Sequence, residues 1–121
     1  MGSLTEYGKQ LRHLRLELSE LLGTMAEKLN ISPAYLSSIE TGSRSIPSDL
    51  TMKIIEIYNL SQEDANNLLK AEANTNKTLT INLENASKEQ IATTVLFARE
   101  IKNMSVKELQ NLYRNLKNRG N

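Results

Sequence analysis

The stretch Thr24–Gly42 constrains the fold of this chain more than any other part of it. Its first residues carry apolar side chains at helical spacing, and Asn30, which follows them, is one of the few residue types other than glycine that tolerate the left-handed backbone of a tight corner. Ser32 and Pro33 then mark a helix start, because a serine hydroxyl caps free N–H groups and proline lacks the N–H that would be unpaired there. The stretch therefore predicts two short helices, the second over residues 33–40, joined by a tight turn.

Residues 7–47 carry this pattern together with its flanking sequence. They read YGxxLRxLR…MAEKLxISPAYLSSIExGxRxIP, which resembles the Cro/lambda-repressor (XRE-type) helix-turn-helix family. The resemblance implies a five-helix, lambda-repressor-like domain, which we place at residues 4–74, with the helix over residues 33–40 lying in a DNA groove. It also implies a buried structural ion pair between Arg15 and Glu40.

The resemblance also assigns contacts with double-stranded DNA. The exposed side of the helix and the loop after it would supply them, through small side chains that meet base edges, hydroxyls that reach the backbone, and one arginine. Tyr35 has two open interpretations, a phosphate contact or packing on its own domain. The expected DNA-binding residues are Pro33, Ala34, Tyr35, Ser37, Ser38, Thr41, Ser43 and Arg44.

The chain departs from the family where the first helix of the motif begins. The usual residues there are a Ser or Thr cap followed by a Gln that contacts a DNA phosphate, whereas this chain has Leu21 and Leu22. We expect this apolar pair to pack against a neighbouring helix or against the C-terminal half. Only the backbone N–H groups of the helix N-terminus then remain to hold an anion at this point.

Composition sets limits on function. The net charge is +1, and residues 1–60 contain six Lys and Arg against seven Asp and Glu, so we expect no large nonspecific contact with nucleic acid and a need for more than one copy. The chain has no cysteine and one histidine, His13, and shows neither a nucleophile–base pair nor metal-ligand spacing. We therefore expect no enzyme activity, no cofactor and no metal. No apolar run is long enough to span a bilayer and no secretory signal is visible, so we expect a cytoplasmic protein without membrane contact.

Three further helices complete the predicted N-terminal domain, at residues 4–18, 48–58 and 61–73. Ser61 begins the last of these with the spacing of a capping box. The helix over residues 48–58 is expected to bury three apolar side chains, those of Leu50, Met52 and Ile55.

A different period begins after residue 77. Residues 78–83 alternate strictly between polar and apolar, which predicts a β-strand whose apolar face carries Leu79, Ile81 and Leu83. Because no second strand is predicted to pair with it, we expect antiparallel pairing with the same strand of a second copy, and hence a homodimer. The alternative is an extended segment lying over the helices.

Two helices with capping-box starts follow the strand, at Ser87 and Ser105. The first carries Ile91, Val95 and Ala98 on one stripe, and the pair has more apolar surface than a small appendage needs. We predict that the strand and both helices, within residues 75–121, form a dimerisation region. The predicted fold class is thus all-α, with this single strand between the two sets of helices.

These features lead to two functional hypotheses. The first is a sequence-specific DNA-binding transcriptional regulator, most simply a dimeric repressor whose two copies of the helix over residues 33–40 bind an inverted-repeat operator. The second is an antitoxin-like or other protein-interaction module whose C-terminal half binds a partner protein. The apolar Leu21–Leu22 pair, the acidic N-terminal half and the absence of a side chain suited to bidentate base recognition on the second helix favour this alternative.

Overall fold

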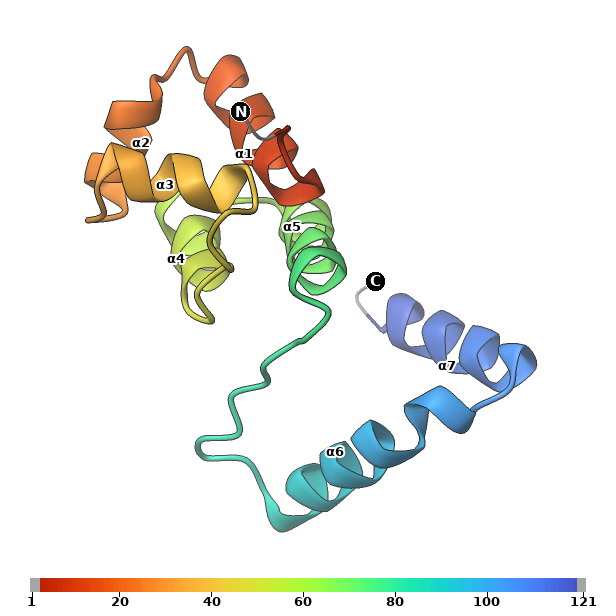
Figure 1. Cartoon of the computed structure of the whole chain (residues 1–121). Helices are drawn as coiled ribbons and strands as arrows, with labels where there is room; N and C mark the ends of the chain where they lie inside the picture. The colour runs from red at the N-terminus through yellow and green to blue at the C-terminus, as the bar shows by residue number, and fades with distance from the viewer. Residues whose placement is uncertain (1–2, 120–121) are drawn as a thin grey trace. The chain divides into compact units, whose positions relative to one another are not determined.

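The computed structural model describes residues 3–119 of the chain, and within them it contains seven α-helices, one short 3-10 helix and no β-strand (Figure 1). The chain divides between Thr80 and Ile81 into two compact units. The first unit holds five helices, which are α1 (Glu6–Glu17), α2 (Leu22–Lys28), α3 (Pro33–Glu40), α4 (Leu50–Ile57) and α5 (Gln62–Asn76). The all-α class is confirmed, and α3 has the predicted bounds.

Hydroxyl side chains set where three of these helices begin. Thr5 accepts a hydrogen bond from the backbone N–H of Gly8 at the start of α1, and Ser32 and Ser61 cap α3 and α5 in the same way. Each cap satisfies an N–H group that has no partner within its helix. These signals lie within a few residues of the groups they satisfy, which is why the sequence predicts them well.

One apolar core holds the first unit together. α3 packs on α1 and α2, while α5 packs on α1 and α4. All five helices and the loop before α4 contribute to this core, so the position of α3 is fixed by its neighbours. The buried apolar side chains are those of Tyr7, Leu11, Met25, Ala26, Leu29, Leu36, Ile39, Ile46, Leu50, Ile54, Leu68 and Ala71.

The side of α4 that faces the core differs from the predicted one. Leu50 is buried as expected, but Ile55 is only partly buried and Met52 is 53% exposed, so the prediction for Met52 is wrong. Thr51 and Ile54 take the inward positions instead. A single position along a helix corresponds to about 100° of rotation, and a polar Thr51 on the buried side breaks the apolar pattern from which the register was predicted.

A chain of buried hydrogen bonds explains why Thr51 lies inside. The Thr51 hydroxyl donates to the Glu72 carboxylate at 2.5 Å, and the Tyr7 hydroxyl lies 2.9 Å from the Thr51 hydroxyl oxygen. Because the single Thr51 proton goes to Glu72, the Tyr7 hydroxyl is the donor to Thr51. Burial raises the pKa of Tyr7, which keeps this donor protonated. This series of hydrogen bonds joins α1, α4 and α5, and among the described residues no buried side-chain oxygen or nitrogen lacks a partner.

The second unit consists of α6 (Lys88–Glu100), the 3-10 helix η1 (Ile101–Asn103) and α7 (Val106–Asn118). Both predicted capping boxes form, with Ser87 and Gln90 at the start of α6 and Ser105 and Glu108 at the start of α7. None of the described residues from Ile81 onward is buried.

The predicted β-strand over residues 78–83 is wrong. The segment has no regular secondary structure, and Leu79 and Ile81 are more than half exposed. A strand requires a partner for its backbone groups, and the described part of the chain offers none. The backbone turns instead at its far end, where Asn82 accepts a hydrogen bond from the N–H of Glu84 and Ala86 donates to the carbonyl of Leu83.

Candidate nucleic-acid interface

The corner between α2 and α3 is closed by a pair of backbone hydrogen bonds. The N–H of Ile31 donates to the carbonyl of Ala26 at 3.0 Å, and the N–H of Asn30 donates to that of Glu27 at 3.1 Å. Asn30 has φ of 59°, in the left-handed region. This is the Schellman arrangement, in which the N–H of a left-handed residue after the helix and the N–H of the residue that follows it satisfy the last carbonyls. The turn leads directly into Ser32, the cap of α3, and fixes the angle between the two helices.

The helix α3 separates a buried side from an exposed one. Leu36, Ile39 and Glu40 point into the domain. Among the predicted DNA contacts, Pro33, Ala34 and Ser37 are exposed, whereas Tyr35 and Ser38 are partly buried. The structure therefore brings small side chains together on the outer side of α3, which would allow a close approach to another surface.

Three hydroxyls at the end of α3 are turned back on the helix. Ser38 donates to the carbonyl of Tyr35 at 2.6 Å, Thr41 to that of Ser37 at 3.1 Å, and Ser43 to that of Ser38 at 3.2 Å. Each hydroxyl donates its one proton to a backbone carbonyl and keeps its oxygen lone pairs as acceptors. In this conformation these groups accept hydrogen bonds, which suits the amino groups of bases rather than phosphate oxygens.

Arg44 lies at the end of the same surface, in the loop that follows α3. Its guanidinium carbon is 6.0 Å from the centre of the Tyr35 ring, and its backbone N–H donates to the carbonyl of Ser38 at 3.1 Å. Gly42, with φ of 83°, allows the chain to turn back in this way. Arg44 itself is exposed, so its charge is available while its side chain rests beside the tyrosine ring.

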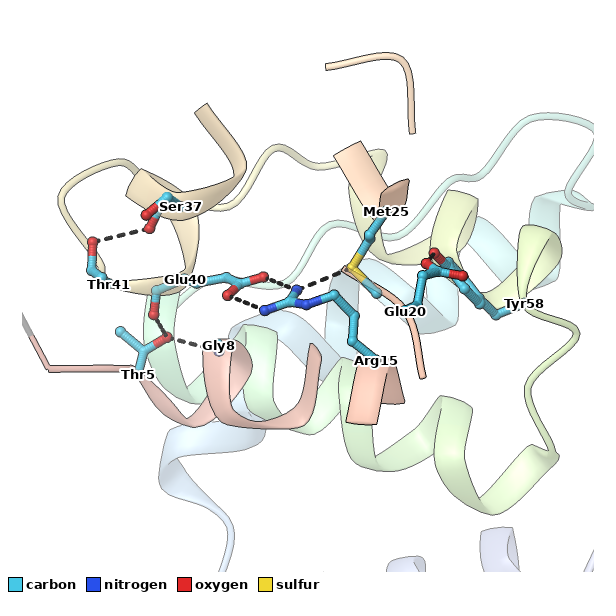
Figure 2. A network of polar contacts seen from close by, with 9 residues as sticks. All are labelled: Thr5, Gly8, Arg15, Glu20, Met25, Ser37, Glu40, Thr41 and Tyr58. Carbon is cyan, nitrogen blue, oxygen red and sulfur yellow. Dashed lines mark hydrogen bonds and ion pairs between the residues drawn. The ribbon is translucent and has the colours of Figure 1, made fainter. Parts of the chain in front are cut away.

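A buried network holds the inner side of α3 (Figure 2). The Arg15 guanidinium contacts both carboxylate oxygens of Glu40, at 2.5 and 3.0 Å, and also donates to the sulfur of Met25 at 3.3 Å. The side-chain hydroxyl of Thr5 donates to the backbone carbonyl of Glu40 at 3.1 Å and accepts from the N–H of Gly8. These contacts tie α1 and α2 to the last turn of α3, and thereby set the orientation of its exposed side.

The start of α2 has no side-chain cap, since the residue in the cap position is Leu21, which is 76% exposed. The sequence predicts that both leucines pack against another part of the protein. Leu22 packs against the core, whereas Leu21 remains exposed. The backbone N–H groups at this end remain available to an anion.

A polar cluster that the sequence does not indicate joins Glu20, before α2, to the last residue of α2 and to the end of α4. Glu20 pairs with Lys28 at 2.7 Å and accepts a hydrogen bond from the Tyr58 hydroxyl, and the Lys28 ammonium lies 5.0 Å from the centre of the Tyr58 ring. Burial raises the pKa of Glu20, but hydrogen bonds from Lys28 and Tyr58 and the charge of Lys28 together lower it below its ordinary value. No local sequence signal joins residues 20 and 58, which only the fold brings together.

The residues predicted for dimerisation lie apart from this surface in the sequence and are accessible. Within α6, Ile91, Val95 and Ala98 are exposed, and Leu83 is partly buried. A second apolar stripe runs along α7. Its members are Val106, Leu109, Leu112, Tyr113 and Leu116.

Comparison with known proteins identifies the motif. A family model described as a helix-turn-helix domain matches residues 6–68, which is more than half of the chain. The chain belongs to the helix-turn-helix domain family. No curated protein and no solved structure gives a significant match. For this helix-turn-helix protein, the family indicates a DNA-binding regulator.

The described residues of the helix-turn-helix protein show neither a metal-binding cluster nor a membrane-spanning helix. Within residues 3–119, no group of three or more His, Cys, Asp or Glu side chains is arranged so that it could bind a metal ion. None of the described helices combines the length and apolar character needed to cross a bilayer.

Proposed function

We propose that this protein is a sequence-specific transcriptional regulator, and that it acts as a dimeric repressor. The observation that carries the proposal is the construction of α3, whose outer side presents Pro33, Ala34 and Ser37 while the buried Arg15–Glu40 pair anchors its inner side. A helix held this firmly and lined with small residues fits closely into a major groove.

Recognition by this surface relies on fit more than on bidentate hydrogen bonds. In this proposal Ala34 contacts a thymine methyl group and Ser38 accepts a hydrogen bond from a base amino group. The Ser38 proton is donated to the backbone carbonyl of Tyr35, which leaves its oxygen free to accept. Arg44 supplies the positive charge next to the helix end and contacts the DNA backbone or a narrow minor groove. We therefore expect DNA shape to contribute to the choice of operator.

The second unit supplies the dimer contact in this proposal. Because residues 78–83 form no strand, the contact is made by helices α6 and α7, whose apolar side chains are exposed. Two helices without a buried residue do not bury enough apolar surface to hold together alone, and a second copy covers them. Two recognition helices would then enter grooves about 34 Å apart, or a multiple of that, on an inverted repeat. Repression follows from competition with the polymerase.

The test is selection from a randomised pool of DNA duplexes, followed by affinity measurements on the enriched sequence at several salt concentrations. We expect an inverted repeat, and we expect Arg44→Ala to weaken binding and to lower the salt dependence by roughly one phosphate contact. Lys70→Ala is the matched control, because Lys70 is an exposed cation on α5. Enrichment of no sequence at low salt would contradict the proposal.

A second candidate is an antitoxin-like or other interaction module, and the exposed apolar side chains of α6 and α7 favour it. In that case these helices cover a different protein rather than a second copy. Sedimentation of the purified full-length chain separates the two candidates. A dimer at micromolar concentration supports the repressor, whereas a monomer that assembles only with another protein supports the interaction module.

A further inference from the structure

A polar groove of about 420 Å³ lies between the loop after α3 and the end of α5. We call it the linker groove, because residue 78, which lines it, belongs to the segment that leaves the first unit. The groove is contiguous with the end of α3, since Gly42 also lines it. Its other lining residues are Arg44, Ser45, Ile46, Thr75, Asn76 and Thr78.

The two walls of the linker groove are clamped together by one side chain. The Asn76 amide nitrogen donates to the carbonyl of Ile46 at 3.0 Å, and its amide oxygen accepts from the N–H of Ile46 at 3.2 Å. This paired contact imitates the hydrogen bonding of a neighbouring strand, and Ile46 is itself buried. The end of α5 is therefore fixed to the loop that carries Arg44, although thirty residues separate Asn76 from Ile46.

The backbone then turns at Lys77. This residue has φ of 61° and its N–H donates to the carbonyl of Ala73 at 2.8 Å, which closes the helix. The left-handed region is costly for a residue with a side chain, so the clamp and the helix end together hold the chain there. As a result, Thr78 lines the groove rather than leaving the domain directly.

The chemistry of the linker groove matches an anion. Among the described residues, Arg44 is the only charged one that lines the groove, and no acidic side chain lines it. Lys77 lies between two of the lining residues in the sequence. Ser45 and Thr78 also line the groove, and each adds a hydroxyl donor. Charge-assisted hydrogen bonds from arginine, supported by hydroxyl groups, are the usual way in which proteins hold a phosphate oxygen.

We infer that the linker groove seats a phosphate of the DNA backbone. The DNA interface thus continues past Arg44 onto residues 75–78, which neither the sequence pattern nor the family match assigns. This inference rests on the proposed function, because it requires α3 to be seated in the groove of the same duplex. Arg44 supplies the charge within the groove, and Lys77 adds a second cation in the segment that lines it. Thr78 supplies a hydroxyl, and Asn76 is a positioning residue that keeps the two walls together.

The test compares Thr78→Glu with Thr80→Glu in the full-length protein. Both residues are exposed, and both variants add one negative charge to the same segment, but only residue 78 lines the groove. We expect Thr78→Glu to weaken binding to the selected duplex at least tenfold more than Thr80→Glu, with equal melting temperatures. We also expect Lys77→Gln to reduce the slope of log affinity against log salt by about 0.9, as one lost phosphate contact does, and Lys70→Gln to leave it unchanged.

Four outcomes would overturn the inference. Equal affinities for the two threonine variants, or an unchanged salt slope for Lys77→Gln, would show that the DNA interface does not continue onto residues 75–78. Inorganic phosphate is added alone as a separate arm. If it shifts the amide resonances of Arg44 and Thr78 while the duplex does not, the groove binds free phosphate rather than DNA. If the wild-type protein enriches no duplex at all, the proposed function is wrong, and this inference, which depends on it, is wrong as well.

Discussion

The Arg15 guanidinium and the Glu40 carboxylate face each other in a two-point contact of 2.5 and 3.0 Å that joins α1 to the last turn of α3. Arg15 is 8% exposed and Glu40 3%, so both charges are removed from water. Arginine suits this position because its planar fork matches both oxygens of a carboxylate. The pair lies directly beneath the proposed DNA-reading side of α3, and its geometry sets how that side is presented.

Removal of one partner should destabilise the protein strongly. We expect Arg15→Met to lower the free energy of unfolding by about 3–5 kcal/mol, because Glu40 is then left buried and charged without a partner. The double variant Arg15→Met/Glu40→Leu should be more stable than this single variant, since no orphan charge remains. Urea unfolding measures both. A double variant that is less stable than Arg15→Met would contradict this account of the pair.

Gly8 allows α1 and the end of α3 to approach each other. A Cβ atom at this position would lie 2.2 Å from the carbonyl oxygen of Glu40, so Gly8→Ala forces two backbones apart. We expect a loss of about 3 kcal/mol or more, despite the better helix propensity of alanine.

Gly23 is the matched control for this prediction. It also lies within a helix, and nothing lies within 4 Å of a Cβ placed there. Gly23→Ala should therefore stabilise the protein by up to about 1 kcal/mol. Thermal unfolding of both variants tests the pair of predictions, which fail if the two substitutions change stability in the same direction.

Local signals explain the part of the fold that the sequence predicts. The bounds of α3 follow from Ser32, Pro33 and the turn at Gly42, and the caps at Ser87 and Ser105 act over three residues. The exposed side of α3 follows from the helical period once its bounds are known. The surface proposed to read DNA is therefore visible in the sequence, although its contacts are not.

Long-range contacts explain what the sequence does not predict. Thr51 takes the buried position expected for Met52 because it bonds to Tyr7 and Glu72, which are 44 and 21 residues away. Residues 78–83 alternate like a strand, but alternation is a local property and strand pairing is not. The linker groove likewise depends on Asn76 and Ile46, whose pairing leaves no trace in the local pattern.

The Glu20 cluster should make stability depend on pH in the acid range. The pKa of Glu20 is below its ordinary value of 4.5 in the folded protein, so its contribution to stability is fully present above about pH 4.5 and disappears as the pH falls through the folded pKa. We expect the stability difference between wild type and Glu20→Gln to be larger at pH 7 than at pH 3. Urea midpoints at both pH values measure it.

Glu27→Gln serves as the control for this dependence, because Glu27 is exposed on α2 and makes no ion pair within the described residues. Its difference from wild type should change little between the two pH values. The cluster would not have the role assigned to it if Glu20→Gln behaved in the same way as Glu27→Gln.

The last prediction concerns the proposed dimer. Leu116 on α7 is 55% exposed and Leu16 on α1 is 69% exposed, so each change to aspartate is readily tolerated within a single copy. In a dimer built from the second unit, Leu116 becomes buried, and an aspartate there places a charge in an apolar contact without a partner. We expect Leu116→Asp to weaken dimerisation by about 30-fold or more, which corresponds to the ~2 kcal/mol of an interface hot spot, and Leu16→Asp to leave it unchanged.

Sedimentation equilibrium measures dimerisation directly, and DNA binding provides an independent readout. Loss of the dimer should reduce affinity for an inverted repeat while affinity for a single half-site is kept, because α3 and Arg44 are untouched. If Leu116→Asp instead weakened half-site binding, α7 would act on the DNA-binding domain rather than on a second copy. A wild-type protein that sediments as a monomer at micromolar concentration would remove the basis for two-fold recognition altogether.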